Sequence, residues 1–260
     1  MAARVLSGFW KLTWVEAKIF TREPMGFVGT LVMPVVIFVL LGRALGLGKL
    51  IGPPSPAGAA ASALGQLPFN LAILSAVLIA ISAVQSLIAI ISIYREGGIL
   101  KRLRATPLSP VTILGAHVVL KLAFTTVSLT LLVLAGRRLF PGVMQVNVFS
   151  FGAAVLLGTL SILSLGFVLA SLVPTPRFAQ LIGAVAFYPM LVLSGLFFPV
   201  DRLPAAFRTI AFVLPTTHAV ALLQGVWDGS GWSAHWVNAA ILLALFGAYT
   251  ALSTKVFRWE

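Results

Sequence analysis

The chain has 260 residues, of which 60% are hydrophobic and 9% charged, and its mean hydropathy is +1.07. An ordinary soluble domain is about 25% charged and less than about 50% apolar, so this composition excludes a typical water-soluble enzyme. The 18 Lys and Arg against six Asp and Glu give a net charge of +12. In a soluble protein this charge would indicate nucleic-acid binding, but here the basic residues lie between long apolar runs. The sequence therefore predicts an all-α polytopic membrane protein without cysteine chemistry.

Residues 3–23 precede the first apolar run and predict an amphipathic helix that lies in the membrane interface. At 100° per residue, four basic side chains fall within about 40° of one another, beside an apolar face. Pro24 ends this helix. Glu16 projects from the apolar side, where it either snorkels to the surface or pairs with a cation on another cytoplasmic element. The four basic residues are Arg4, Lys11, Lys18 and Arg22.

Six apolar runs are long enough to cross a membrane, since about 20 residues at 1.5 Å each cover about 30 Å of hydrocarbon. Together they form a single membrane domain over residues 1–260, and we expect the first run to act as the insertion signal because no cleavable signal peptide is recognisable. Pro34 and Pro189 lie inside the first and fifth runs and should kink them. The predicted spans are 26–42, 67–93, 111–136, 148–173, 178–200 and 234–253.

Six spans place both chain ends on one side, and the distribution of Lys and Arg selects that side. With the N-terminus in the cytoplasm, eleven Lys and Arg fall in cytoplasmic segments and six in outer segments. The sequence therefore predicts that both termini are cytoplasmic.

The loop after the second span reads YREGGILKRLRATPLSP. Gly97 and Gly98 break the span helix, and apolar and basic residues then alternate at helical spacing. Two interpretations stay open: a positively charged loop with a chance amphipathic turn, or a short helix over 95–108 that docks on a cytoplasmic partner. In the second interpretation the docking residues are Arg95, Glu96, Leu100, Lys101, Arg102, Leu103, Arg104, Thr106 and Pro107.

Polar residues form one stripe on the third span. His117, Lys121, Thr125 and Ser128 follow one another at spacings of four, four and three, so they face a cavity or another helix together. Burial of Lys121 costs about 3 kcal/mol or more without a partner, so this residue either snorkels to the cytoplasmic surface or contacts substrate or a coupling partner. Gln85 shares a face of the second span with several serines, which suits helix packing or the wall of a translocation path.

The stretch 201–230 is apolar but interrupted by Gly and Pro, and its segments 203–214 and 216–227 are each too short to cross. We predict a re-entrant helix pair in the outer leaflet, with Pro204 in the first turn of one helix and Thr216 or Thr217 capping the other. A surface loop is the alternative, and the density of Phe, Leu and Val disfavours it. The residues just before the pair are candidates for an outer gate, or for plain packing: Ser194, Gly195, Phe197, Phe198 and Pro199.

An intramembrane enzyme is the competing class. The chain has no H-E-x-x-H, no G-x-S-x-G and no paired intramembrane aspartates. Its three histidines fall on both sides of the predicted topology, so we expect neither a catalytic residue nor a metal site. A passive channel fits less well than a driven exporter, because the chain combines a single intramembrane cation with a cytoplasmic docking loop.

Three segments, in order and spacing, resemble the membrane subunit of ABC-2 type ABC transporters, the exporter permease family. The first is REP at 22–24, directly before the first span. The second is the loop 95–108, which contains RE and LKRLRATPL. The third is LSGLFFPV at 193–200, followed by LP at 203–204 and at 214–215. The resemblance covers essentially the whole chain.

The resemblance implies a dimer of permease subunits, a homodimer or a heterodimer with a paralogue, on two ATP-binding subunits in a bacterial or archaeal cytoplasmic membrane. Residues 95–108 would be the coupling helix, and 3–23 the connecting helix with Glu16, Arg22 and Glu23. ATP and Mg²⁺ would bind to the partner and no cofactor to this chain. The nearest match to a phosphate-binding Walker A loop, at 42–50, has the wrong glycine spacing and Leu in place of Ser or Thr.

Taken together, the residues and the resemblance predict the permease subunit of an ATP-driven exporter. It would move an amphiphilic or hydrophobic substrate outward, either a drug-like compound or a lipid. The permease of a lipid-linked oligosaccharide or polysaccharide exporter is the alternative. Membrane lipid is a further expected partner, and nucleic acid is not.

Overall fold

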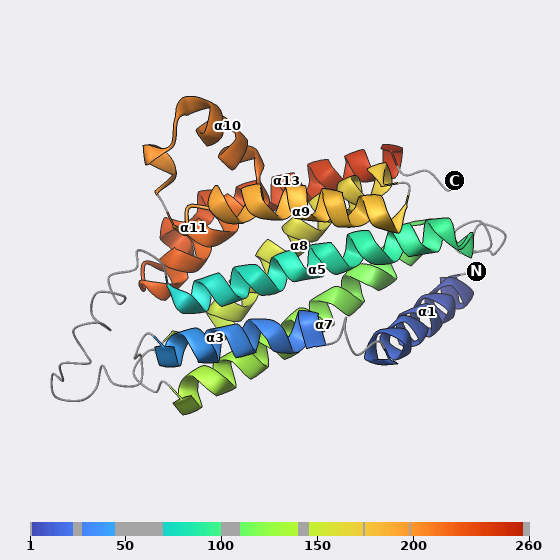
Figure 1. Ribbon diagram of the computed structural model, residues 1–260, viewed down its shortest axis with the longest axis horizontal. Helices are drawn as coiled ribbons and strands as arrows, with labels where there is room; N and C mark the ends of the chain where they lie inside the picture. The colour runs from blue at the N-terminus through green and yellow to red at the C-terminus, as the bar shows by residue number, and fades with distance from the viewer. Residues whose placement is uncertain are drawn as a thin grey trace, which may run out of the picture.

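Every regular element in the described part of the chain is helical, which confirms the all-α prediction (Figure 1). The computed structural model describes residues 2–22, 28–44, 70–99, 110–139, 146–173, 175–197 and 199–256. The elements in chain order are α1 (Ala2–Arg22), the π-helix η1 (Val28–Val32), α3 (Met33–Ala44), α5 (Leu71–Glu96), α7 (Pro110–Leu139), α8 (Val148–Leu172), α9 (Pro176–Val192), the 3-10 helix η2 (Val200–Arg202), α10 (Ala205–Val213), α11 (Pro215–Trp227), α12 (Gly231–Ala234) and α13 (Trp236–Val256).

Four helices are long and apolar enough to cross a membrane: α5, α7, α8 and α13. Helices α10 and α11 meet the same test only as a pair, and they are bent by 81° at the break between them. The predicted first and fifth spans correspond to shorter apolar helices, α3 with 12 residues and α9 with 17. The described part of the chain thus holds four or five candidate spans, and the count of six stays a prediction.

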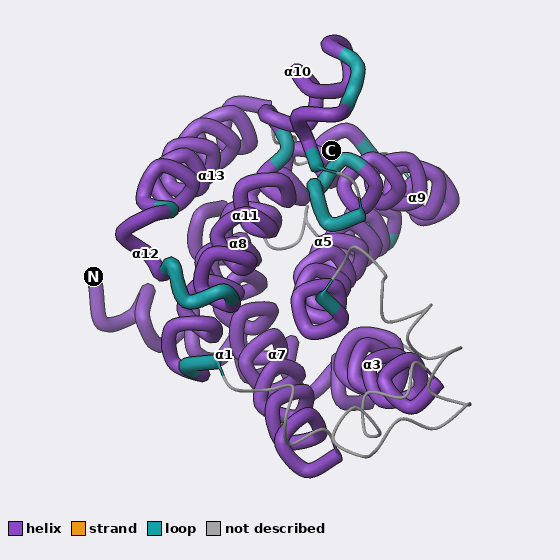
Figure 2. The backbone as a smooth tube through the Cα atoms, turned by 90° about the vertical axis from the view of Figure 1, so that its left-hand side faces the viewer, coloured by secondary structure: helices purple, strands orange, loops and turns teal. Residues whose placement is uncertain are grey.

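Helices α5 and α8 form the centre of the bundle (Figure 2). Helix α5 packs against α3, α7, α8, α9 and α11, and α8 packs in addition against α13. Helix α1 lies along α7 on the outside of the bundle. This arrangement puts the second predicted span, with its polar face, in contact with five other α-helices and with η1.

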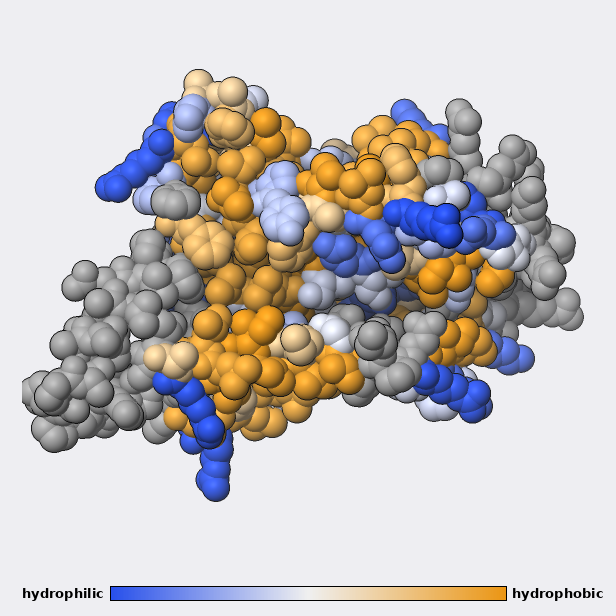
Figure 3. Space-filling model, viewed as in Figure 1, coloured by the Kyte–Doolittle hydropathy of each residue, from blue (hydrophilic) through white to orange (hydrophobic). Residues whose placement is uncertain are grey.

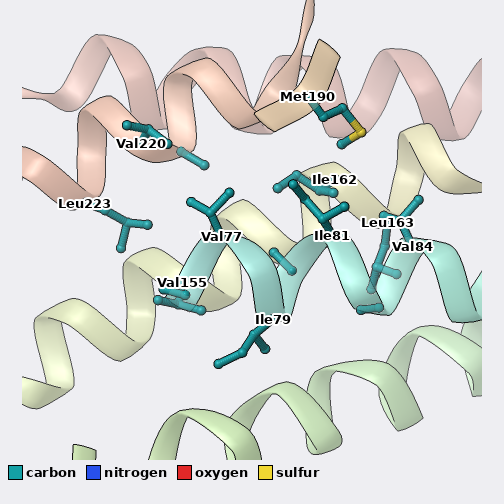
Figure 4. Close-up of a cluster of buried hydrophobic side chains, with 14 of the residues drawn as sticks. Val77, Ile79, Ile81, Val84, Val155, Ile162, Leu163, Met190, Val220 and Leu223 are labelled. Atoms are coloured by element: carbon teal, nitrogen blue, oxygen red, sulfur yellow. The ribbon is translucent and has the colours of Figure 1, made fainter. Parts of the chain in front are cut away.

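The core between these helices is built from aliphatic side chains (Figure 4). Val77 and Ile81 of α5 point toward α8 and α11, and Ile162 of α8 lies across from Ile81. Small residues allow the closest approaches, because a Cβ added to Gly158 of α8 would lie 2.9 Å from the Cβ of Ala219 on α11. Such close packing stabilises helix pairs in lipid, where hydrophobic burial between helices contributes little.

The ends of several helices follow from local sequence. The side chain of Asn147 accepts hydrogen bonds from the amides of Phe149 and Ser150 and so caps the start of α8. Thr175 caps α9 in the same way, directly before a proline at the first helical position. Helix α5 ends at Glu96, where Gly98 adopts a φ of 65°.

Two prolines behave differently from one another. Pro189 lies inside α9, as the sequence predicts. Pro34 is instead the second residue of α3, directly after the π-helix η1. The irregular turn of the first apolar run therefore precedes the proline, which is expected because proline removes a backbone donor at the start of the regular helix.

The start of α1 and the end of α13 lie at the same end of the molecule, while α10 projects from the opposite end of the bundle (Figure 1). Apolar side chains cover most of the described surface in the view of Figure 3. An apolar surface of this kind is expected of a helical bundle that sits in a membrane.

Candidate translocation path and coupling surface

The polar stripe of α7 faces the inside of the bundle. His117, Lys121, Thr125 and Ser128 are each no more than 3% exposed, and they lie on one side of the helix over three turns. The spacing of these residues had indicated a cavity or another helix as their neighbour, and in the structure that neighbour is protein.

Lys121 lies within the bundle and not at its surface. Its side chain is 3% exposed, and its Nζ donates a hydrogen bond to the Ser86 hydroxyl of α5 at 2.5 Å. An ammonium group in a low-dielectric interior is strongly attracted to any anion or oriented dipole that comes near it. The buried ammonium makes Lys121 a candidate contact for a polar or anionic group.

The rest of the stripe joins α7 to two other elements. The His117 ring lies 5.7 Å from the ring of Tyr94 on α5, measured between centroids. The Ser128 hydroxyl donates to the carbonyl of Leu31 in η1 at 3.3 Å. The π-helix thus meets the polar stripe directly, and single π-helical turns are frequent at functional sites.

Gln85 lies on another face of α5. Its side-chain amide donates to the carbonyl of Gly183 on α9 at 3.1 Å. A Cβ on Gly183 would lie 2.4 Å from Gln85 Oε1, so the glycine makes room for this contact. Neighbouring residues of a helix point about 100° apart. Gln85 therefore binds α9 while Ser86 binds α7, and the structure does not bring Gln85 together with Lys121.

Arg95 contacts the protein itself. Its guanidinium donates to the carbonyls of Ser171 and Val173 at the end of α8, where the last carbonyls of a helix lack partners within the helix. Glu96, the last residue of α5, is exposed. The other predicted docking residues lie outside the described residues: Leu100, Lys101, Arg102, Leu103, Arg104, Thr106 and Pro107.

The predicted connecting helix corresponds to α1. Lys11, Lys18 and Arg22 are exposed, as their shared face predicts. Glu16 lies within α1, but its side chain lies outside what the structure describes, as does Glu23.

Sequence reasoning missed two tryptophans on α1. Trp10 and Trp14 are 59% and 72% exposed and lie one turn apart beside the basic face. Tryptophan is enriched where membrane meets water. The signal was present in the sequence as an i, i+4 pair on an otherwise predicted interfacial helix.

The predicted gate residues form a tight turn after α9. The Ser194 hydroxyl donates to the carbonyl of Leu191 at 2.7 Å and accepts from the amide of Leu196. Gly195 has a φ of 83°, which favours glycine at this position. Phe197 is half-buried against the core, and Pro199 is exposed. Phe198 lies outside the described residues.

The predicted cap of the second short helix is wrong, and Pro204 lies one position before the first helical residue of the other helix. Pro204 is the N-cap of α10, and Leu214 is the N-cap of α11, with Pro215 as the first helical residue. The Thr217 hydroxyl instead donates to the carbonyl of Leu193 at 3.1 Å, which ties α11 to the end of α9. Proline at the first helical position leaves one orphan amide fewer to cap, and Thr217 is therefore free to bind elsewhere.

A histidine network at the crease between α10 and α11 was also missed. His218 is 3% exposed, and its ring nitrogens lie 3.0 Å from the carbonyl of Phe212 and 3.1 Å from Oδ1 of Asn238. These contacts join α10, α11 and α13. The sequence signal is weak, because it consists of one His and one Asn twenty positions apart in apolar helices.

Comparison with known proteins supports one family. The profile of the family described as ABC-2 type transporter matches residues 7–226. Nodulation protein J of Rhizobium leguminosarum bv. viciae is 42% identical over 65 residues, which cover 25% of each protein. The inner membrane transport permease YhhJ of Escherichia coli K12 is 26% identical over 174 residues, which cover 63% of this chain and 44% of YhhJ. The aligned parts thus span less than half the length of these relatives.

The family profile extends from within α1 to the last turn of α11, so it takes in the polar stripe, the segment 95–108 and the turn after α9. The described part of the chain also holds several helices that are long and apolar enough to cross a membrane. The match over 220 of the 260 residues establishes that the chain belongs to the ABC-2 type transporter family.

Proposed function

We propose that this chain is the permease subunit of an ATP-driven exporter, in which a separate ATP-binding subunit supplies the energy. The family match supports a transport permease, and the relative YhhJ is named an inner membrane transport permease. The proposal adds the energy source, the outward direction and an amphiphilic or hydrophobic substrate.

The observation that carries this proposal is the buried polar stripe of α7 within an apolar bundle. A membrane helix does not retain a buried lysine for stability, because an apolar residue costs less at the same place. The stripe ends at η1, and its lysine lies at the contact between α7 and α5. A substrate with an apolar body and a polar or anionic head is the kind of molecule that such a surface binds.

Coupling to ATP hydrolysis is proposed for the segment 95–108. Its first residue, Arg95, holds the end of α5 to the end of α8 through two carbonyls. A displacement of this segment by a partner would therefore move both central helices of the bundle. In this proposal Arg95 transmits the movement, and the exposed Glu96 and the residues after it contact the partner.

The outer exit is proposed for the turn after α9 and the α10–α11 pair. This end of the bundle lies opposite the start of α1 and the end of α13 (Figure 1). Gly195 supplies the flexible point, and Thr217 links the turn to α11. Phe197 and Phe198 would close the exit between transport cycles.

Reconstitution tests this function. The permease and its ATP-binding subunit, purified together and inserted in liposomes, should accumulate a fluorescent amphiphile in inside-out vesicles only when MgATP is present outside. Transport without ATP, at a rate set by the gradient alone, would instead identify a passive channel. Complete absence of a co-purifying ATP-binding subunit would contradict the proposal as well.

A further inference from the structure

An open groove of about 590 Å³ lies between the first apolar run and the last turns of α7. Valines of η1 and α3 form one wall, and the segment from Leu131 to Leu139 of α7 forms the other. At 1.5 Å per residue this segment is roughly 12 Å long. Helices α3 and α7 both end at the end of the bundle from which α10 projects (Figure 1). The volume of the groove falls within the range of about 300–1,000 Å³ that is typical of small-molecule sites.

The walls of the groove are apolar and open to the outside of the bundle. Seven of the eight lining side chains are apolar, and Val36, Leu131 and Leu134 among them are exposed. Ala135 is the smallest lining residue and leaves the hollow between its larger neighbours. Apolar surface covers α3 and the neighbouring part of α7 in Figure 3. In a membrane such a groove faces hydrocarbon, and an acyl chain matches its walls.

Arg138 is the one charged residue among those that line the groove, and it lies in the last turn of α7. Its side chain is exposed. Helices η1, α3 and α7 contain no acidic residue, so no carboxylate on the elements that form the walls competes for its guanidinium. Arg43 in the last turn of α3 adds positive charge at the same end of the bundle. A guanidinium presents a planar set of donors that matches the oxygens of a phosphate group.

We propose that this groove binds one phospholipid, with an acyl chain along Leu131 and Leu134 and its phosphate at Arg138. The charge of Arg138 at the end of an apolar groove selects a lipid that carries a phosphate over one that offers hydrocarbon alone. The bound lipid joins the short helix α3 to α7. It takes no part in coupling or transport, because the groove opens to the outside of the bundle whereas the polar stripe of α7 is buried.

Lipid retention by the purified full-length chain tests this site. The protein is exchanged into detergent micelles that contain equal amounts of dioleoylphosphatidylglycerol and dioleoylglycerol, which share their acyl chains and differ in the phosphate-bearing head group. Native mass spectrometry then counts the lipids that stay bound. We expect one phosphatidylglycerol per chain, in several-fold excess over dioleoylglycerol. A135W fills the floor of the groove and should lower this retention about tenfold, equivalent to about 1.4 kcal/mol.

Matched variants separate the site from general effects of size and charge. A244W places tryptophan on an exposed position of α13 that does not line the groove, and it should retain lipid as the unaltered chain does. R138Q should remove the preference for the lipid that carries a phosphate. R137Q should keep this preference, because Arg137 is exposed one position earlier and does not line the groove.

Three results would overturn the proposal. The first is equal retention of the two lipids by the unaltered chain, and the second is an equal loss of preference in R138Q and R137Q. The third is a change of oligomeric state in A135W with unchanged lipid retention, because the groove would then be a contact between two copies of the chain. Failure of the transport assay would leave these measurements unaffected.

Discussion

Lys121 is the residue with the most specific proposed role in transport. Its ammonium is buried between α7 and α5, with Ser86 as a hydrogen-bond acceptor. Replacing a buried ion by an apolar residue of similar volume is often neutral or stabilising. If a substitution of Lys121 lowers transport and leaves folding unchanged, the lysine therefore acts in transport.

We predict that K121M assembles normally and lowers transport about tenfold or more, because a charge-assisted hydrogen bond to substrate is worth about 1.5–3 kcal/mol. The measurement is ATP-dependent uptake in inside-out vesicles, with the melting temperature as a check on folding. K255M removes an exposed cation and serves as the matched control with unchanged transport. A K121M permease that transports at the full rate would show that the lysine is structural.

The sequence predicts which residues of α7 share a face, but not which residues they bind. The stripe of α7 follows from helical spacing alone, since residues three and four apart share a face. Its partner Ser86 does not, because α5 carries several serines and spacing alone does not select one of them. Gln85 binds a backbone carbonyl of α9, and a backbone group carries no signal of residue type. Packing partners of this kind are fixed by the fold.

At the scale of helices, the contact between α8 and α11 depends on one glycine. Gly158 and Ala219 approach so closely that a new Cβ would lie 2.9 Å from that of Ala219. Neither side chain can rotate away, so the two helices would have to separate. This contact supports the position of α11, which in turn holds the turn after α9 through Thr217.

We predict that G158A destabilises the protein by about 1–3 kcal/mol through overpacking, measured as a lower melting temperature in detergent. A219G in the same chain should recover most of this loss because it restores the space. The matched control is G247A on α13, where a Cβ would meet no atom within 4 Å and helix propensity favours Ala by up to about 1 kcal/mol. Equal effects of G158A and G247A would contradict the tight contact.

The proposed outer exit can be tested at Phe197 and Phe198. F197A/F198A should leave the permease assembled, raise the basal ATPase rate or the leak of substrate, and weaken net export, because the pair closes the exit in our proposal. F207A removes an exposed phenylalanine of α10, 51% exposed, and should change none of these rates. If the double variant turns over and exports as the unaltered chain does, the two phenylalanines only fill space between helices.

Several helices were predictable in position but not in detail. The long apolar runs indicate α5, α7, α8 and α13, whose lengths suffice for a membrane span. The first and fifth runs are harder to assign, because α3 and α9 are short and each lies next to an irregular turn or a proline. The cap of α11 was misassigned by two or three residues, because Thr216 and Thr217 are favoured cap residues whereas Pro215 starts the helix before them.

For the whole molecule, the number of membrane spans can be tested directly. The start of α1 and the end of α13 lie at one end of the bundle, and α10 projects from the other (Figure 1). The chain has no cysteine, so single cysteines can report the side of each segment without a background signal.

We predict that S109C and K255C react with impermeant thiol reagents only from the cytoplasmic side, and that S55C and S230C react only from outside. Lys255 and Ser230 are exposed in the structure, so the absence of labelling there has a clear meaning. The measurement is labelling in intact cells against inside-out vesicles. Labelling of S230C and K255C from the same side would overturn the six-span topology.

We propose that a separate ATPase drives this permease through the segment 95–108. A sharp test compares two acidic double variants, L103D/R104D in that segment and R137D/R138D in the exposed last turn of α7 at the opposite end of the bundle. Each is tested for co-purification of the ATP-binding subunit and for ATP-dependent transport. We expect L103D/R104D to insert normally but to lose the subunit or its coupling, while R137D/R138D keeps both. Undiminished co-purification together with full ATP-dependent transport in L103D/R104D would contradict this proposal.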